Sequence, residues 1–197
     1  MPSDAIFVAP HAREASGDNA IPQILAVASA LAADGTVDTD IVQITRVFHT
    51  GADPMERMVL RPEFDGAVKD GDHYVLVDDV TNMGGTLAEL SNYIRCAGGI
   101  VSAVIVLVNA GRSKQFHPAY NVINKIERRF SNEIRDIFGI VPSALTANEA
   151  NYIIGFRSVD EIRNRMAKAK KETNLRLRSK GIERQDQSSH AQIFTAK

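Results

Sequence analysis

The 197-residue chain is poor in the features that mark several classes of protein. Its single cysteine, Cys96, excludes an internal disulfide framework and a zinc cluster built on thiolates. No apolar run approaches the ~18 residues that a membrane span requires. The first residues, MPSDAIFVAP, lack the basic region and the long apolar stretch of a secretory signal. These absences predict a protein of the cytoplasm, where thiols stay reduced.

Neither sign of charge dominates the chain. The 23 Lys and Arg residues against 24 Asp and Glu give a formal net charge of -1. The charge of the whole chain therefore gives no reason to expect a nucleic acid or a membrane as partner. Apolar residues make up 44% and charged residues 24%, which is typical of a globular protein. The length suits one ordinary domain with a core and an appendage.

The first half of the chain alternates short apolar runs with helical patterns. Strands are predicted at 5–9, 39–47, 73–79 and 100–110, with helices at 21–35 and 85–99. The last of these strands is continuous and β-branched, which predicts that both of its faces are covered. The alternation indicates an α/β fold, a doubly wound parallel sheet of four to five strands in which the first and third strands are neighbours. Residues 49–66 have no consistent period and predict a long loop or a small hairpin.

Beyond about residue 115 the pattern becomes helical. Apolar residues then recur at spacings of three or four, which predicts one face of a helix: Ile123, Ile126, Phe130, Ile134 and Ile137. The stretches TANE (146–149) and SVDE (158–161) fit the capping box and predict two further helix starts. We therefore divide the chain into an α/β core over 1–112, a C-terminal helical extension over 113–182 and a disordered tail over 183–197.

The segment 160–184 is rich in basic residues. It holds nine of them against four acids: Arg163, Arg165, Lys168, Lys170, Lys171, Arg176, Arg178, Lys180 and Arg184. Both a solvated helix face and a surface for nucleic acid or another acidic partner fit this composition, and the solvated face is the more common outcome. No aromatic residues interleave these charges, which disfavours binding of single-stranded nucleic acid.

The densest chemistry lies in LVDDVTNMGGTLAEL (76–90), where an apolar strand ends in two aspartates. Carboxylates only accept hydrogen bonds, so Asp78 and Asp79 suit the vicinal hydroxyls of a sugar or a divalent cation. The glycine pair that follows leads into a helix, and the backbone N–H groups of residues 82–86 there form an anion site suited to phosphate. The stretch matches neither a Walker P-loop, which needs a lysine, nor a G-x-G-x-x-G dinucleotide motif.

The stretch VLVDDVTNMGGTL resembles the phosphoribosyl pyrophosphate (PRPP) signature of type I phosphoribosyltransferases. The family fold is a parallel sheet of four or five strands with helices on both faces, which corresponds to residues 1–112. The resemblance implies that Asp78 and Asp79 hold the ribose hydroxyls. It assigns further residues to the phosphates, namely Asn82, Met83, Gly84, Gly85 and Thr86 to the 5′-phosphate, and His11 and Arg13 to the pyrophosphate. The segment 49–66 corresponds to the mobile flap of the family.

The resemblance also implies an activity. Such a glycosyltransferase of nucleotide metabolism moves 5-phosphoribose from PRPP to an acceptor such as a nucleobase and releases pyrophosphate. Mg²⁺ enters with PRPP and would meet Asp78 and Asp79 through water, while Arg46 and Arg57, with Arg61, would offset the charge of the leaving group. The family is usually a homodimer. A non-catalytic protein that senses PRPP or a nucleotide is the alternative, and a hydrolase or structural descendant that kept only the loop is a third.

Two neighbouring residues depart from the family pattern. Members usually have threonine or alanine where Met83 stands, and members that handle 6-oxopurines have aspartate where Asn82 stands. Most members also carry a helical hood before the first strand, whereas four residues precede 5–9 here. We therefore expect any hood to come from the C-terminal helices, and the identity of the acceptor stays open.

Overall fold

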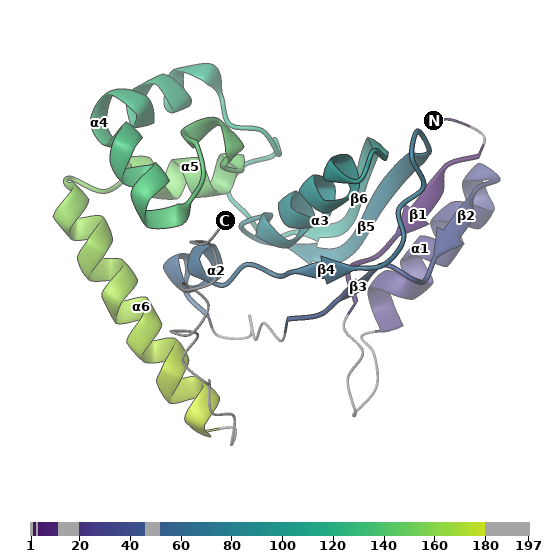
Figure 1. The fold of residues 1–197 in the computed structure, drawn as a ribbon, viewed down its shortest axis with the longest axis horizontal. Helices are drawn as coiled ribbons and strands as arrows, with labels where there is room; N and C mark the ends of the chain where they lie inside the picture. The colour runs from purple at the N-terminus through teal and green to yellow at the C-terminus, as the bar shows by residue number, and fades with distance from the viewer. Residues whose placement is uncertain (1, 3, 12–19, 46–51, 180–197) are drawn as a thin grey trace, which may run out of the picture.

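The computed structural model describes residues 2, 4–11, 20–45 and 52–179 (Figure 1). The predictions for Arg13 and Arg46 and for the tail over 183–197 lie outside these residues. Within the described ranges, none of the helices is long and apolar enough to cross a membrane.

A four-stranded parallel sheet forms the centre of the α/β part. Its strands are β1 (Ile6–Val8), β2 (Thr36–Asp38), β5 (His73–Thr81) and β6 (Ile100–Asn109), in the order β2-β1-β5-β6. β1 and β5 pair directly, with Phe7 opposite Val75, so the predicted adjacency of the first and third long strands is confirmed. The predicted fold class, a parallel sheet with helices on both faces and a C-terminal helical extension, is confirmed as well.

Helices cover the two faces of this sheet because successive residues of a strand point to opposite sides. On one face, α1 (Ala20–Ala33) packs Ala26 against the sheet, in an apolar cluster that includes Val75. On the other face, α3 (Gly85–Cys96) buries Leu90 in a cluster that includes Leu76. Both helices start and end within three residues of their predicted bounds.

The second strand differs from its prediction over 39–47. The strand of the main sheet is β2, and it ends at Asp38, whose carboxylate accepts 2.9 Å hydrogen bonds from the backbone amides two and three residues further on. This turn breaks the apolar run. Beyond it, β3 (Val42–Gln43) leaves the main sheet and pairs antiparallel with β4 (Phe64–Asp65). β4 lies within 49–66, but its partner β3 precedes that segment, so the described residues do not form the small hairpin expected inside 49–66.

The segment 49–66 also contains a helix, which was not predicted because its apolar residues show no helical period. This helix, α2 (Pro54–Val59), begins at a capping box: the Asp53 carboxylate accepts from the amide of Glu56, and the Glu56 carboxylate accepts from that of Asp53. The signal was present in the sequence as Asp-Pro-Met-Glu. A helix of six residues is too short to show an apolar period, so the prediction of a long loop or a small hairpin missed this helix.

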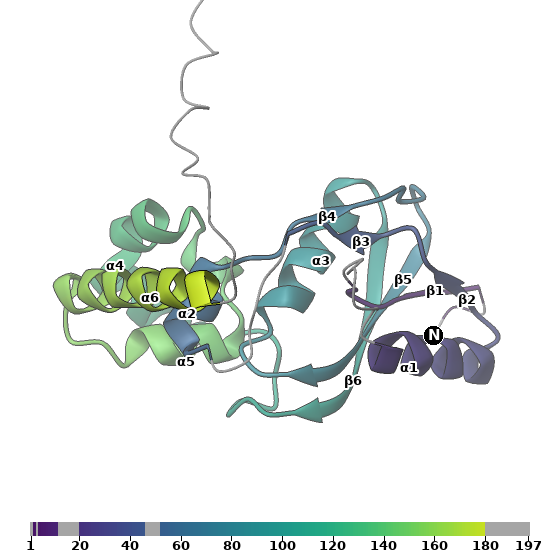
Figure 2. The ribbon, with the colours of Figure 1, turned by 90° about the horizontal axis from the view of Figure 1, so that it is seen from below.

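The C-terminal helices form a second group beside the sheet (Figures 1 and 2). They are α4 (Tyr120–Phe138), the short 3₁₀ helix η1 (Pro142–Ala144), α5 (Ala147–Ile154) and α6 (Val159–Ser179). With α2 they enclose one apolar cluster, in which Met55 and Met58 of α2 meet Ile126 and Ile153. We refer to α2, α4, α5 and α6 as the helical group. Part of the range assigned to the α/β core thus packs among the C-terminal helices.

Both predicted helix starts in this group are confirmed. Thr146 and Glu149 form a complete capping box at α5. At α6 the Ser158 hydroxyl accepts from the Glu161 amide, but the Glu161 carboxylate accepts from the amide of Arg157 and not from that of Ser158. The predicted apolar face of α4 is also confirmed, since Ile126 and Ile134 are fully buried.

The prediction that β6 is covered on both faces is wrong. β6 lies at the edge of the sheet, and Val104, Leu107 and Val108 are 39–64% exposed. The chain after β6 runs to the helical group and not back across the sheet (Figure 1), so none of the later helices up to Ser179 covers this strand.

Candidate functional site

A cavity of about 410 Å³ lies at the carboxyl ends of β1 and β5, where parallel α/β sheets bind ligands. We call it the main cavity. Its described lining consists of Pro10, Pro22, Gln43, Arg57, Leu60, Pro62 and residues 78–86. The structure therefore brings together both aspartates, the whole predicted phosphate loop and Arg57.

The two aspartates lie inside β5, which continues to Thr81, two residues past its predicted end. Asp78 accepts a 2.9 Å hydrogen bond from the amide of Asp79, and Asp79 accepts a 2.8 Å bond from that of Val80. Burial, with the neighbouring negative charge of Asp79, raises the pKa of Asp78 to about 7. A hydroxyl donor or a cation between the two carboxylates would relieve this repulsion.

The glycine pair starts α3 without a side-chain cap. Gly84 is the N-cap residue, with φ +81°, a conformation that suits glycine, and it has no side chain to cap the first turn. The first amides of a helix have no partner within the helix and carry the positive end of its dipole. Because Gly84, Gly85 and Thr86 also line the main cavity, the positive end of α3 borders this cavity, where a negative charge would be favourable.

The carbonyl groups of the loop point to α5. The Asn82 carbonyl accepts a 2.9 Å hydrogen bond from Nδ2 of Asn148, and the Met83 carbonyl accepts one from the Thr146 hydroxyl. The Met83 side chain is 7% exposed and packs in the apolar cluster of the helical group. The residue that departs from the family pattern thus joins the loop to the C-terminal helices.

The predicted arginines have different surroundings. Arg57 lines the main cavity, and its Nε donates to the Ala52 carbonyl at 3.1 Å. Burial and then the charge of Arg176 lower the pKa of Arg57, so an anion beside it would be favourable. Arg61 lies outside the described lining, because its guanidinium forms ion pairs with Glu149 at 2.7 Å and with Glu89 at 3.4 Å.

His11 is not brought into the described lining of the main cavity. Its ring is buried, Nδ1 donates to the Ala9 carbonyl at 3.1 Å, and its own carbonyl accepts from the amide of Gln43. The neighbouring Pro10 lines the cavity in its place.

A second cavity, of about 420 Å³, shares two residues with the first. It is lined by Pro54, Asn82, Met83, Ala110, Gly111, Arg112, Asn148, Asn151 and Tyr152. We call it the side cavity. The α5 residues were missed because nothing in the sequence relates them to a loop more than sixty residues earlier.

The described residues contain no group of three His, Cys, Asp or Glu side chains that would hold a metal ion. Mg²⁺ prefers a few carboxylate contacts together with the phosphates of a substrate. Asp78 and Asp79 fit such a contribution, made directly or through water, and a bound cation would offset the charge that raises the pKa of Asp78.

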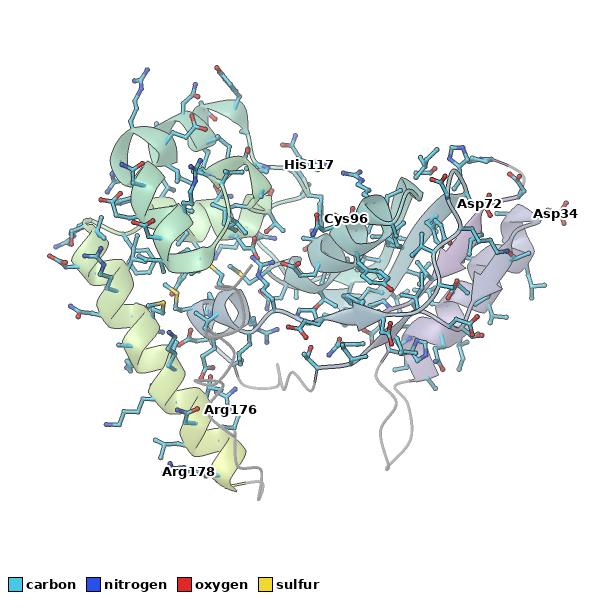
Figure 3. The ribbon with its side chains drawn as sticks, viewed as in Figure 1. Asp34, Asp72, Cys96, His117, Arg176 and Arg178 are labelled. Atoms are coloured by element: carbon cyan, nitrogen blue, oxygen red, sulfur yellow. The ribbon has the colours of Figure 1, made fainter. Side chains whose placement is uncertain are left out.

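Two of the nine basic residues in 160–184 turn toward α2. Arg165 pairs with Asp53 at 2.8 Å, and Arg176 pairs with the buried Glu56 at 2.7 Å. Both partners are acids of the α2 capping box, so α6 is fixed to α2 at the start of that helix. Arg178, which follows Arg176 near the C-terminal end of α6, is exposed (Figure 3).

Comparisons with known proteins find two relatives, and the chain matches only part of the length of each. No family model matches the chain. The chain is similar to protein TraN of Escherichia coli, with 36% identity over 168 residues, which cover 83% of this chain and 38% of that protein. It is also similar to an uncharacterized protein of Haemophilus influenzae, with 42% identity over 91 residues that cover 46% and 20%. The chain thus spans well under half the length of either relative.

Solved structures with a similar arrangement include phosphoribosyltransferases. An adenine phosphoribosyltransferase from Thermoanaerobacter pseudethanolicus matches 54% of this chain and 70% of its own, with 17% identity and a TM-score of 0.35. A hypoxanthine phosphoribosyltransferase from Trypanosoma cruzi matches 76% of both chains, with 12% identity and a TM-score of 0.36.

Proposed function

We propose that the chain binds Mg²⁺–PRPP in the main cavity and transfers its 5-phosphoribosyl group to an acceptor. One observation carries this proposal: the uncapped start of α3 and the acid pair of β5 line the same cavity. A phosphorylated pentose has a phosphate for the first and vicinal hydroxyls for the second. A ligand with phosphate alone would leave Asp78 and Asp79 without a role.

Transfer would proceed by attack of an acceptor atom on C1 of the ribose. The bond from C1 to the pyrophosphate oxygen breaks, and pyrophosphate leaves with the electron pair. Arg57 stands at the cavity wall, where its charge would favour the developing anion. When bound, Mg²⁺ neutralises much of the charge on the pyrophosphate.

The side cavity is our candidate for the acceptor. It adjoins the main cavity through Asn82 and Met83, so a molecule there would lie next to the sugar. Asn151 offers both a donor and an acceptor, and the ring of Tyr152 offers an aromatic surface. This lining suits a planar heterocycle such as a nucleobase.

A non-catalytic sensor of PRPP or of a nucleotide is the second candidate. The observation in its favour is the pairing of Arg61 with Glu149 and Glu89, which leaves Arg57 as the cation in the described lining of the main cavity. Catalysis of pyrophosphate release needs positive charge at the leaving group more than binding alone does.

Calorimetric titration with Mg²⁺–PRPP tests the proposal, with ribose 5-phosphate as a second ligand. Asp79→Asn removes one charged hydrogen-bond acceptor, and we expect affinity to fall about 10- to 150-fold. Asp72→Asn, just before the opposite end of β5 (Figure 3), is the matched control and should bind normally. Absence of PRPP binding by the unmutated protein would refute the proposal. Binding without pyrophosphate release over a panel of nucleobases would favour the sensor.

A further inference from the structure

The first turn of α5 makes two hydrogen bonds to consecutive peptide groups of the phosphate loop. Thr146 is 4% exposed, and its hydroxyl donates to the Met83 carbonyl while accepting from the Glu149 amide at 3.2 Å. Nδ2 of Asn148 donates to the Asn82 carbonyl at 2.9 Å, and Oδ1 accepts from the Ser113 amide at 2.8 Å. Each side chain thus holds the loop with its donor, while its acceptor is fixed by α5 itself for Thr146 and by the segment after β6 for Asn148.

These bonds fix the direction of the loop amides. In a planar trans peptide the carbonyl and the following N–H point in opposite directions. With the carbonyls of Asn82 and Met83 turned to α5, the N–H groups of Met83 and Gly84 point away from it. The described lining of the main cavity contains residues 82–86 and none from α5, so the cavity lies on the side to which the amides point.

The packing at this contact is close enough to require glycine. A Cβ on Gly111 would lie 2.2 Å from Nδ2 of Asn148 and 2.5 Å from the Asn82 carbonyl oxygen. A Cβ on Gly84 would lie 3.3 Å from Cγ2 of Thr146. The loop therefore has little freedom to turn its peptide groups while α5 remains in place.

We infer that Thr146 and Asn148 are positioning residues, which hold the loop so that its amides face the main cavity. Neither side chain needs to touch the ligand's phosphate. The orientation of the loop follows from the contacts alone, whereas its effect on phosphate binding rests on the proposed function.

Asn148→Asp is the decisive variant. It removes the donor to Asn82 and keeps the acceptor for Ser113, and aspartate is favourable in the first turn of a helix. Thr146→Val removes the hydroxyl, whereas Thr146→Ser retains it and is the matched control. Asn164→Asp, on the exposed side of α6, controls for the added charge.

Two measurements separate the inference from the proposed function. The backbone amide order parameters of residues 83–86 in the free protein, measured by NMR relaxation, should fall from about 0.85, which is typical of a rigid backbone, to below about 0.6 in Asn148→Asp and Thr146→Val. Affinity for Mg²⁺–PRPP should fall about 3- to 10-fold. Thr146→Ser and Asn164→Asp should keep the order parameters of the unmutated protein and remain within about twofold of its affinity.

Unchanged order parameters of residues 83–86 in both Asn148→Asp and Thr146→Val would overturn the inference, as would an equal fall in Thr146→Ser. If the unmutated protein binds no PRPP, the proposed function fails, and the relaxation data still decide whether the two residues position the loop. A fall in order parameters confined to α5 itself would show loss of the helix cap without an effect on the loop, and would also count against the inference.

Discussion

Replacement of Asp78 by asparagine is expected to stabilise the protein at neutral and alkaline pH. Asparagine has nearly the same size, and its Oδ1 can still accept from the amide of Asp79. Burial and the charge of Asp79 raise the pKa of Asp78 from 3.8 to about 7. Ionised Asp78 therefore costs the folded protein up to about 4 kcal/mol, and we expect the variant to gain about 2–4 kcal/mol at pH 8.

The sign of the pH dependence follows from the two pKa values. Between about pH 4 and about pH 7 folded Asp78 keeps a proton that the unfolded chain has released. This carboxyl therefore lowers stability as the pH rises through that window, with no further change above it. Urea unfolding followed by circular dichroism at about pH 4.5 and about pH 8 measures the free energy of unfolding in both proteins. The variant should lose this part of the pH dependence.

Asp72→Asn is the control, because it removes a carboxylate just before the opposite end of the same strand. If Asp78→Asn is no more stable than the unmutated protein at pH 8, ionised Asp78 does not destabilise the folded protein by the amount stated above. The same conclusion follows if the variant retains the pH dependence. A gain in stability together with weaker PRPP binding would identify Asp78 as a residue retained for its ligand at the expense of the fold.

Three further substitutions test the packing around the site by urea unfolding. Arg176→Met leaves the buried carboxylate of Glu56 without its ion pair and should lower the free energy of unfolding by about 3 kcal/mol. Arg178→Met on the same helix is the control and should change it by less than about 0.5 kcal/mol. Equal effects would contradict the α2–α6 contact. Gly84→Ala places a Cβ at φ +81° and should cost about 1–2 kcal/mol and weaken phosphate binding; unchanged binding would argue against the loop as the phosphate site. Gly35→Ala would bring a Cβ within 2.5 Å of the Ala5 carbonyl, just before β1, and should destabilise the sheet by about 2 kcal/mol without a specific effect on the site. A neutral result would argue against this close approach.

Much of the fold was predictable because its signals are local. The apolar run of β5 and the glycine pair before α3 lie within fifteen residues, so one stretch of sequence predicts a strand, an anion loop and a helix. Short elements were harder. The carboxylate of Asp38 ends β2 inside an apolar run, and α2 has too few residues to show a period.

The surroundings of the loop were not predictable for a different reason. The hydrogen bonds from Thr146 and Asn148 join residues separated by 63 and 66 positions, and no propensity or spacing encodes such pairs. Arg61 shows the same difficulty. Its position near the motif favoured a role at the pyrophosphate, whereas the buried carboxylate of Glu149 on α5 holds it.

The ion pairs between α2 and α6 have a consequence for the order of folding. They join residues 112 and 120 positions apart, and we therefore expect Arg57 to reach its place at the cavity wall only after α6 has docked on α2. Closing such long stretches of chain is slow compared with forming the β5–α3 unit. We expect the phosphate loop (82–86) to form early, and α2, which carries Arg57 at the cavity wall, to reach its place late. A nascent chain that ends before α6 would then expose a half-built cavity, and pulse-labelled hydrogen exchange during refolding would detect this sequence of events as late protection of α2.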